Sequence, residues 1–328
     1  MIQSNGQAVI SLIIPAYNIG KYLDDCLYSL YRQTYQNWEA VVVDDGSTDE
    51  TPEICDEWSY KDERVKVIHQ KNSGVSIARN TALKNISGDI VGFVDGDDLL
   101  TDNALEVVAK CFSDDTLDAV FTGHKRIDEN RNETETRKGV KRNNCTGEEA
   151  VYSTLKTGRD GYLGVPWNKF FRKKCIYKSL GEIIEFDSKY KVGEDQIWLL
   201  HVLEKVENVK FIEEPIYCYR IRTGSAVHSK AWNVSNESEI EARTELVRIV
   251  STKYPNLKFA ASEKCRRCMK KLYKFAVSIK NTKAIGMVSR CGLKGYFDVM
   301  KSEKFSMQCK LKETLWQMVF IVSSLIFH

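Results

Sequence analysis

Short apolar runs alternate with amphipathic stretches along the first 125 residues of the chain. The runs are rich in β-branched residues, which is typical of buried strands, and they occupy 9–14, 40–43, 65–68, 90–94 and 119–122. The stretches between them have helical spacing, and they lie at 22–33, 52–58, 75–85 and 104–112. Strands that alternate with helices predict a parallel sheet covered on both faces.

The residues that follow each predicted strand are the first candidates for a binding site, because ligands bind beyond the carboxyl ends of parallel strands. Pro-Ala-Tyr-Asn follows the first run at 15–18, Asp-Asp-Gly-Ser follows the second at 44–47, and Asp-Gly-Asp-Asp follows the fourth at 95–98. This edge has neither the glycine-rich turn of a dinucleotide site nor the Gly-Lys-Ser/Thr of a P-loop. Its carboxylates predict a site for a hard cation.

Asp95 and Asp97 stand one residue apart, so both can reach one Mg²⁺ or Mn²⁺ ion through oxygen atoms. Such an ion keeps open positions for the phosphates of a nucleotide and neutralises a leaving diphosphate. The alternative is that 95–98 is only a tight turn with side-chain-to-backbone hydrogen bonds. The second aspartate pair at the same edge favours the metal site.

Four segments, at 15–18, 43–49, 74–80 and 93–98, occur in an order and spacing that resemble the nucleotide-diphospho-sugar half of the family 2 inverting glycosyltransferases. The resemblance implies the α/β fold called GT-A, with a mostly parallel central sheet flanked by helices. We expect this catalytic domain to span 1–230 and a small all-helical domain to span 231–328.

The resemblance also implies roles for individual residues at the nucleotide. Asp45 would accept the imide hydrogen of uracil, Pro15 and Tyr17 would frame the base, and Arg79 would help to hold the nucleotide. For Arg79 the alternative is a solvated cation on a helix.

The Asp95–Gly96–Asp97 turn would belong to the same nucleotide-sugar site. Asp95 would meet the ribose or the metal shell, and Asp97 would be the direct metal ligand. Arg220 and Arg222 suit the donor diphosphate by charge and planarity. His228 could complete a Mn²⁺ shell, although a lone histidine is more often an ordinary surface or core residue.

Direct displacement at an anomeric carbon requires a base that takes the proton of the acceptor hydroxyl. Glu194 and Asp195 precede an apolar helical run at 197–206, where an acidic pair is ordinarily a helix cap. In the resembled family the second member of such a pair supplies the base, so we expect Asp195 to be the base and Glu194 its supporting neighbour.

The acceptor side is represented by Trp167 and Asn168, in a segment that is similar to a recurrent one of bacterial family members. An indole face suits the apolar face of a sugar ring, and an amide both donates and accepts hydrogen bonds. A place for Trp167 in the hydrophobic core is the equal alternative.

Charge is unevenly distributed along the chain. From Lys230 onward 19 Lys+Arg stand against 8 Asp+Glu, a balance of +11, whereas the first 229 residues have 29 against 37, a balance of −8. In this basic tail one apolar helical stripe is predicted to be buried, with Arg267, Lys270, Lys271 and Lys274 on other faces; its members are Cys265, Cys268, Leu272, Phe275 and Ile279.

The basic face has several open uses besides solvation, among them anionic lipid headgroups and a polyanionic acceptor. The apolar end at 315–327 favours peripheral membrane contact or packing in a homo-oligomer, but its 13 residues are too few to span a bilayer. Nucleic acid is not expected, because no recognition motif accompanies the charge. Ten scattered cysteines and a polar start without an apolar leader predict a cytoplasmic protein, with contact at the inner face of the membrane left open.

Together these features predict a metal-dependent inverting glycosyltransferase with Mn²⁺ or Mg²⁺. It would transfer galactose, glucose or N-acetylglucosamine from a UDP-sugar to a hydroxyl of a growing bacterial surface glycan, carried by a polysaccharide unit, a glycolipid or a glycoprotein adhesin. The chain lacks the Gln-x-x-Arg-Trp motif of processive synthases, which favours single addition. The alternatives are a nucleotidyltransferase, a two-carboxylate glycosidase, and a basic membrane- or polyanion-binding module with a degenerate nucleotide domain.

Overall fold

The computed structural model describes residues 8–156, 164–178, 181–222, 231–293 and 307–326, which group into two compact units. The first unit comprises Met1–Ala150, Val165–Ser188 and Trp198–Ser225, and the second comprises Val151–Gly164, Lys189–Ile197 and Ala226–His328. The sequence predicts a single boundary at 230. The structure adds two internal segments to the helical C-terminal unit, and one of them contains Glu194 and Asp195.

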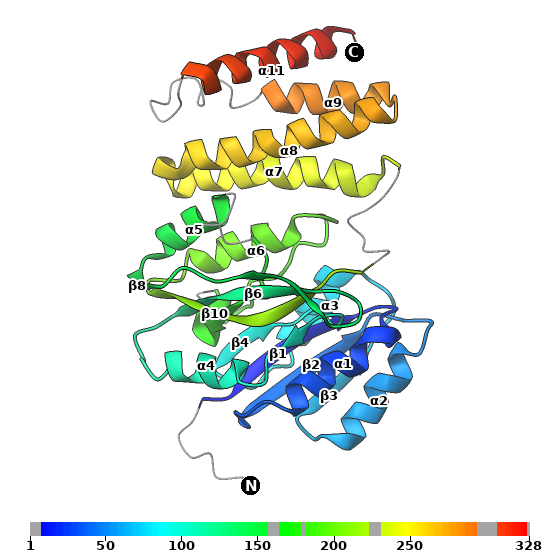
Figure 1. Cartoon of the computed structure of the whole chain (residues 1–328), viewed down its shortest axis with the longest axis vertical. Helices are drawn as coiled ribbons and strands as arrows, with labels where there is room; N and C mark the ends of the chain where they lie inside the picture. The colour runs from blue at the N-terminus through cyan, green and yellow to red at the C-terminus, as the bar shows by residue number, and fades with distance from the viewer. Residues whose placement is uncertain (1–7, 157–163, 179–180, 223–230, 294–306, 327–328) are drawn as a thin grey trace. The chain divides into compact units, whose positions relative to one another are not determined.

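The first unit is built on one sheet, whose first half is parallel (Figure 1). This half has the order β3-β2-β1-β4, and its strands are β1 (Ile10–Ala16), β2 (Trp38–Asp44), β3 (Val65–His69) and β4 (Ile90–Phe93). Nearly every residue of β1, β2 and β4 is buried. The continuous apolar runs are explained by this burial on both faces.

The second half of the sheet is mixed, which corrects the expectation of a mostly parallel sheet. β10 (Val209–Arg220) runs parallel to β6 (Ala119–Ile127), but β9 (Lys169–Arg172) lies antiparallel between β4 and β6. The other antiparallel additions are β5 (Leu99–Leu100), β7 (Glu133–Arg137) and β8 (Arg142–Cys145). β7 and β8 are polar and mostly exposed, so no apolar run reveals them in the sequence.

Helices cover both faces of this sheet. One hydrophobic cluster joins the sheet to α1 (Gly20–Tyr31), α2 (Thr51–Lys61) and α4 (Ala104–Cys111), and α3 (Val75–Leu83) packs on β1 and β2 without joining that cluster. Behind β4 and β9, aromatic rings pack edge to face or stacked, and they belong to Phe93, Phe171, Phe186 and Trp198. Two helices continue from one unit into the other, α5 (Gly147–Leu155) and α6 (Glu194–Leu203). A short 3₁₀ turn follows β9 at Lys173–Ile176.

The second unit is helical, as the sequence predicts. Its long helices pack one against the next (Figure 1), in the order α7 (Val234–Lys253), α8 (Lys258–Ser278), α9 (Thr282–Leu293) and α11 (Met307–Ile326), with a 3₁₀ turn at Pro255–Leu257 before α8. Their core contains Ile240, Met269, Leu272, Val288 and Phe320. In the part of the chain that the structure describes, no helix is long and apolar enough to cross a membrane.

The predicted stripe on α8 is only partly correct. Leu272 is buried, but Cys265, Cys268, Phe275 and Ile279 are half-buried. The fully buried residues of α8 share only Leu272 with the predicted stripe. They are Ala261, Ser262, Arg266, Met269, Leu272 and Ala276.

Three of the four basic side chains predicted for the other faces of α8 are exposed, namely Arg267, Lys271 and Lys274. Lys270 is half-buried, and its ammonium lies 5.6 Å from the centre of the Trp316 ring on α11.

Candidate active site

The loops after β1 and β2 are joined to each other, as the parallel sheet predicts. The Asn18 backbone N–H donates to Ser47 Oγ at 3.0 Å, and Asn18 Oδ1 accepts from the Thr48 N–H at 2.8 Å. Asn18 has a left-handed backbone conformation, with φ at 50°, which an asparagine adopts at low cost. Sequence reasoning did not single out Asn18. Pro15, near the end of β1, is half-buried, and Tyr17 in the loop is 50 % exposed and accessible to a ligand.

Asp45 lies buried at the end of β2, where its carboxylate binds the segment that leads into α3. Oδ1 accepts hydrogen bonds from Gln70 Nε2 at 2.7 Å and from the Ser73 N–H at 2.8 Å, and Oδ2 accepts from the Gly74 N–H at 2.7 Å. A carboxylate has about four acceptor positions, so three are used and one stays open. Contact of Asp45 with uracil is compatible with these bonds and stays a prediction.

The turn at 95–98 concentrates carboxylates after β4. The Asp98 N–H donates to the Asp95 carbonyl at 2.9 Å, so the segment is a tight turn, as the alternative interpretation held. Arg79 is buried and donates from Nη2 to Asp95 Oδ1 at 3.1 Å, so it is no solvated cation. Burial and the charge of Asp95 raise the pKa of Asp97. The turn therefore holds negative charge that favours a cation.

Asp98 is the carboxylate of this turn that faces inward, and it was not among the predicted site residues. It accepts from Tyr217 Oη at 2.6 Å and from the Arg220 N–H at 2.7 Å. The Tyr217 hydroxyl also accepts from the Asp95 N–H at 3.1 Å. Burial and the charge of Asp97 raise the pKa of Asp98 well above its usual range. Asp98 and Tyr217 thus fasten the turn to β10.

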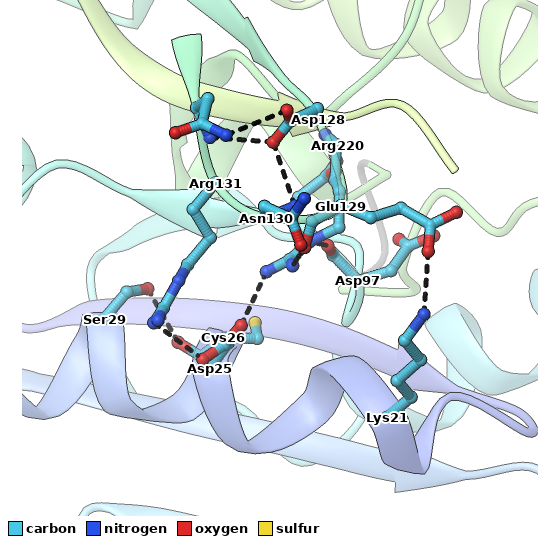
Figure 2. Close-up of polar contacts among 12 residues, drawn as sticks. Lys21, Asp25, Cys26, Ser29, Asp97, Asp128, Glu129, Asn130, Arg131 and Arg220 are labelled. Atoms are coloured by element: carbon cyan, nitrogen blue, oxygen red, sulfur yellow. Dashed lines mark hydrogen bonds and ion pairs between the residues drawn. The ribbon is translucent and has the colours of Figure 1, made fainter. Parts of the chain in front are cut away.

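Arg220 lies beside the turn at 95–98 (Figure 2). Its side chain is 1 % exposed. Its guanidinium donates to the Asp97 carbonyl at 2.9 Å, to Asp25 Oδ2 of α1 at 3.0 Å and to the Glu129 carbonyl at 3.2 Å. The sequence predicts that Arg220 binds the donor diphosphate, but in the structure the residue ends strand β10 and its side chain is turned to the protein. These contacts give it a structural role, and diphosphate binding by Arg220 gains no support from them.

Arg222 is the more accessible cation of this pair. Its Nε donates to Asp97 Oδ2 at 2.6 Å, and both side chains are partly exposed. Its guanidinium also lies 5.6 Å from the centre of the Tyr22 ring. His228, the predicted third metal ligand, lies outside the described residues.

Trp167 and Asn168 are core residues, which corrects their predicted place at the acceptor. Trp167 is 6 % exposed and stacks on Tyr217, with ring centroids 4.5 Å apart. The buried Asn168 amide donates to the Thr122 carbonyl at 2.8 Å and accepts from Lys169 Nζ at 2.7 Å. The antiparallel strand β9 directs this segment into the sheet, so the core alternative is the correct one for Trp167.

Glu194 and Asp195 form the first turn of α6 in the second unit. Glu194 is buried, whereas Asp195 is partly exposed and accepts from the Gln196 N–H at 2.7 Å. Gly193 precedes them with φ at +91°, a conformation that favours glycine. The acidic pair thus lies in the first turn of α6, where negative charge is favourable for the helix dipole, and the base role of Asp195 stays a prediction.

Whether this site could hold a divalent cation depends on the ligand atoms that its side chains offer. Within the described ranges, no group of three or more His, Cys, Asp and Glu side chains is arranged to hold a metal ion. Asp95 and Asp97 still fit one, since both offer the oxygen ligands that Mg²⁺ and Mn²⁺ prefer. Burial and the charge of Asp95 raise the pKa of Asp97, and a bound cation would oppose both effects. Further ligands would have to come from a substrate or from beyond the described residues.

The fold and this carboxylate-rich edge agree with the GT-A class that the sequence resemblance implies. The sequence model of glycosyl transferase family 2 matches residues 11–176, half of the chain, and the protein belongs to that family. The glycosyltransferase GlyA of Streptococcus pneumoniae is 34% identical over 235 residues, covering 68% of this chain and 32% of GlyA. A putative teichuronic acid biosynthesis glycosyltransferase of Bacillus subtilis, TuaG, is 35% identical over 122 residues, covering 37% of this chain and 48% of TuaG. The chain thus spans about a third and about half of these relatives.

Solved structures support the fold. The crystal structure of residues 1–349 of S. aureus TarS in complex with UDP-GlcNAc matches with a TM-score of 0.71 at 23% sequence identity, covering 96% of this chain and 89% of that one. The predicted GT-A fold is therefore confirmed. The match to glycosyl transferase family 2 confirms the predicted family and gives no support to the nucleotidyltransferase and glycosidase alternatives.

Proposed function

We propose that the protein transfers a hexose from a UDP-sugar to a hydroxyl group of a bacterial surface glycan, with inversion at the anomeric carbon. The observation that carries the proposal is the convergence of Asp45, Arg79, Asp95 and Asp97 at the carboxyl edge of the parallel strands. Such an edge offers an acceptor for a base, cations for phosphates and oxygen ligands for a metal.

The uridine part of the donor is the best supported. The open acceptor position of Asp45 suits the imide N–H of uracil, and Tyr17 is accessible for stacking on the base. The bound UDP-GlcNAc in the matching TarS structure supports a uridine donor. N-acetylglucosamine is therefore the first of the three candidate sugars, followed by galactose and glucose.

Asp97 and Asp95 would hold the divalent cation, and His228 stays a candidate third ligand. When bound, the cation would neutralise charge on the diphosphate. Arg222 is the protein's own cation for the same group, because it is accessible and bound to a single carboxylate. Arg220 is excluded from this role in our proposal by its buried contacts.

The reaction that we propose is a single displacement. Asp195 accepts the proton of the acceptor hydroxyl, whose oxygen forms the new bond to the anomeric carbon. The bond from that carbon to the β-phosphate oxygen breaks, and its electron pair leaves with UDP. Attack from the opposite face gives a β-linkage from an α-linked donor. Glu194 supports Asp195 from the same turn of α6.

The acceptor class is proposed from the names of the proteins that this chain is similar to. The name of TuaG refers to teichuronic acid biosynthesis, which supports an acceptor in surface-glycan synthesis; polysaccharide, glycolipid and glycoprotein acceptors all stay open. Contact of the basic C-terminal helices with the inner face of the membrane, or with a second subunit, stays a prediction. It is supported by exposed apolar side chains on α11, among them Leu315, Met318, Val322, Leu325 and Ile326.

The test is the release of UDP from UDP-GlcNAc, UDP-galactose and UDP-glucose, each measured with Mn²⁺, with Mg²⁺ and with EDTA. We expect metal-dependent release from one donor and its loss in Asp97→Asn. Asp115→Asn is the matched control, because Asp115 is 98% exposed and lies on the same unit.

If the protein releases no UDP in the absence of an acceptor, the binding of UDP and Mn²⁺ is measured by calorimetric titration instead. Failure of both ligands to bind would overturn the proposal and favour a degenerate binding module.

A further inference from the structure

Gln70 directly follows β3, and its backbone is fixed to the end of β2. Its N–H donates to the Asp44 carbonyl at 2.9 Å, which continues the pairing of β2 with β3 by one residue. Gly46 packs closely on the same segment. It has φ at +73°, and a Cβ added to it would lie 2.7 Å from the Asn72 nitrogen and 3.1 Å from the Gln70 carbonyl oxygen. The half-buried Gln70 side chain therefore starts from a backbone that the sheet holds in place.

The amide group of Gln70 is oriented by a partner on each side. Its Nε2 donates to Asp45 Oδ1 at 2.7 Å, and its Oε1 accepts from Thr81 Oγ1 on α3 at 2.8 Å. An ionised carboxylate only accepts hydrogen bonds, so the amide nitrogen has to face Asp45 and the amide oxygen has to face Thr81. The side chain of Gln70 thus links Asp45 to helix α3 in one orientation.

This hydrogen bond makes the two carboxylate oxygens of Asp45 different from each other. Oδ1 has two donors, which are Gln70 Nε2 and the Ser73 N–H at 2.8 Å. Among the described residues, Oδ2 has one donor, the Gly74 N–H at 2.7 Å. Each carboxylate oxygen has about two acceptor positions, so the open position lies on Oδ2. Without Gln70, each oxygen would have one donor and one open position.

We propose that Gln70 is a positioning residue that sets the base specificity of the donor site. It keeps the open acceptor position of Asp45 on Oδ2, which suits the imide N–H of uracil. Cytosine has a ring nitrogen without a hydrogen at the same place, so its lone pair would face the lone pair of the carboxylate. A site built to accept a hydrogen bond rejects an analogue that cannot donate one. The inference rests on the proposed contact of Asp45 with uracil.

The difference between the two oxygens predicts what happens when the carboxylate is replaced by an amide. In Asp45→Asn the amide oxygen should take the place of Oδ1, because it keeps two hydrogen bonds there and only one at the other place. The amide nitrogen then takes the place of Oδ2 and offers an N–H where the carboxylate offers a lone pair. Asp45→Asn should therefore bind cytidine nucleotides better than uridine nucleotides, and this reversal should depend on Gln70.

The test is isothermal titration calorimetry of the full chain with UDP and with CDP, at saturating Mn²⁺. These ligands differ only in the base, and the ratio of their dissociation constants measures the preference. We expect the wild type to bind UDP about tenfold or more tightly than CDP, and Asp45→Asn to prefer CDP. In the double variant Asp45→Asn/Gln70→Met the ratio should return to within about threefold of one, because the amide oxygen then has no preferred place.

The matched control replaces Gln36, an exposed glutamine that precedes β2. Adding Gln36→Met to Asp45→Asn should leave the reversed preference unchanged. Thr81→Val is a second way to test the same link, because it removes the hydroxyl that holds the Gln70 amide and keeps the shape of the side chain. Added to Asp45→Asn, it should weaken the reversed preference in the same direction as Gln70→Met. Thermal unfolding verifies that each variant is folded.

Two results would overturn the inference. One is a folded Asp45→Asn that still prefers UDP. The other is a Gln70→Met change that weakens UDP and CDP equally in the Asp45→Asn background and leaves the ratio reversed, which would give Gln70 a purely structural role. Failure of the wild type to bind UDP would instead overturn the proposed uridine donor, and the inference with it.

Discussion

Arg222 Nε and Asp97 Oδ2 lie 2.6 Å apart, so the cation proposed for the diphosphate is paired with the carboxylate proposed for the metal. Both groups are partly exposed, and a metal at Asp97 and a diphosphate at Arg222 would each compete with this ion pair. The ion pair therefore couples metal binding to diphosphate binding. Asp97 is also the proposed metal ligand, and Arg222 is also the proposed diphosphate cation.

Arg222→Ala should change metal binding and nucleotide binding in opposite directions. Without Arg222, Asp97 loses a competing cation, so Mn²⁺ should bind the nucleotide-free chain about threefold to tenfold more tightly. UDP in the presence of saturating Mn²⁺ should bind about tenfold or more weakly, as expected for a lost charge-assisted hydrogen bond. Isothermal titration calorimetry at pH 8 measures both.

The control for this prediction is Arg32→Ala, which removes an exposed arginine from its pair with Asp102. It should leave both affinities unchanged. Weaker binding of Mn²⁺ in Arg222→Ala would show that Arg222 helps to build the metal site, contrary to the prediction.

Asp25→Asn should destabilise the fold of the first unit. Asp25 pairs with Arg220, which is fully buried, and also with Arg131 at 3.0 Å (Figure 2). Removing one partner of a buried charge costs more than removing an exposed one, and we expect a loss of about 2 kcal/mol or more in the free energy of unfolding. Urea unfolding measures it.

The exposed pair of Arg32 and Asp102 offers the matched comparison. Asp102→Asn should cost less than about 1 kcal/mol, as exposed ion pairs do. Equal costs for Asp25→Asn and Asp102→Asn would show that Arg220 finds other partners or water.

Trp167 and Tyr17 should respond in opposite ways to truncation. Trp167→Ala removes a buried ring from the stack on Tyr217 and should cost about 3 to 5 kcal/mol of folding stability. Tyr17→Ala should leave stability nearly unchanged, because its ring is half exposed, and should raise KM for the UDP-sugar. Thermal unfolding and donor kinetics distinguish the two. A stable Trp167→Ala with a changed acceptor preference would restore the sugar-platform interpretation.

The candidate residues that lie at the carboxyl edge of the sheet, where the sequence places them, have local signals. Asp45, Asp95 and Asp97 each follow an apolar run, and the rule that ligands bind at the carboxyl edge needs only the order of strands. Arg79 belongs to a motif of the resembled family, and its contact with Asp95 spans only 16 positions.

The parts that the sequence missed depend on pairings far apart in the chain. Arg220 reaches Asp25 across 195 positions, and nothing in either neighbourhood indicates the other. Trp167 turned inward because β9 is inserted antiparallel between β4 and β6, an arrangement that a short polar-flanked run does not reveal. The sequence pattern predicts which faces of helices and strands are apolar. It does not predict which polar side chains, far apart in the chain, contact each other in the fold.

Glu39 offers the clearest pH dependence of stability, at the edge of the sheet opposite the active site. Burial alone would raise the pKa of Glu39, but hydrogen bonds from Lys66, Ser11 and Ser87 outweigh burial and lower the pKa to about 2. A carboxyl group whose pKa is lowered by folding stabilises the protein above its unfolded pKa of about 4.3, and this stabilisation is lost as the pH falls toward 2.

Glu39→Gln should therefore be less stable than the wild type by about 3 kcal/mol at pH 7. The difference should shrink steadily as the pH falls from 4.5 to 3, because the wild type then gives up the same stabilisation by taking a proton. Urea unfolding at a series of pH values measures it, with Glu182→Gln as the control on an exposed glutamate. A difference that stays constant down to pH 3 would mean that the Glu39→Gln variant loses packing or hydrogen bonds and that the charge of Glu39 contributes little.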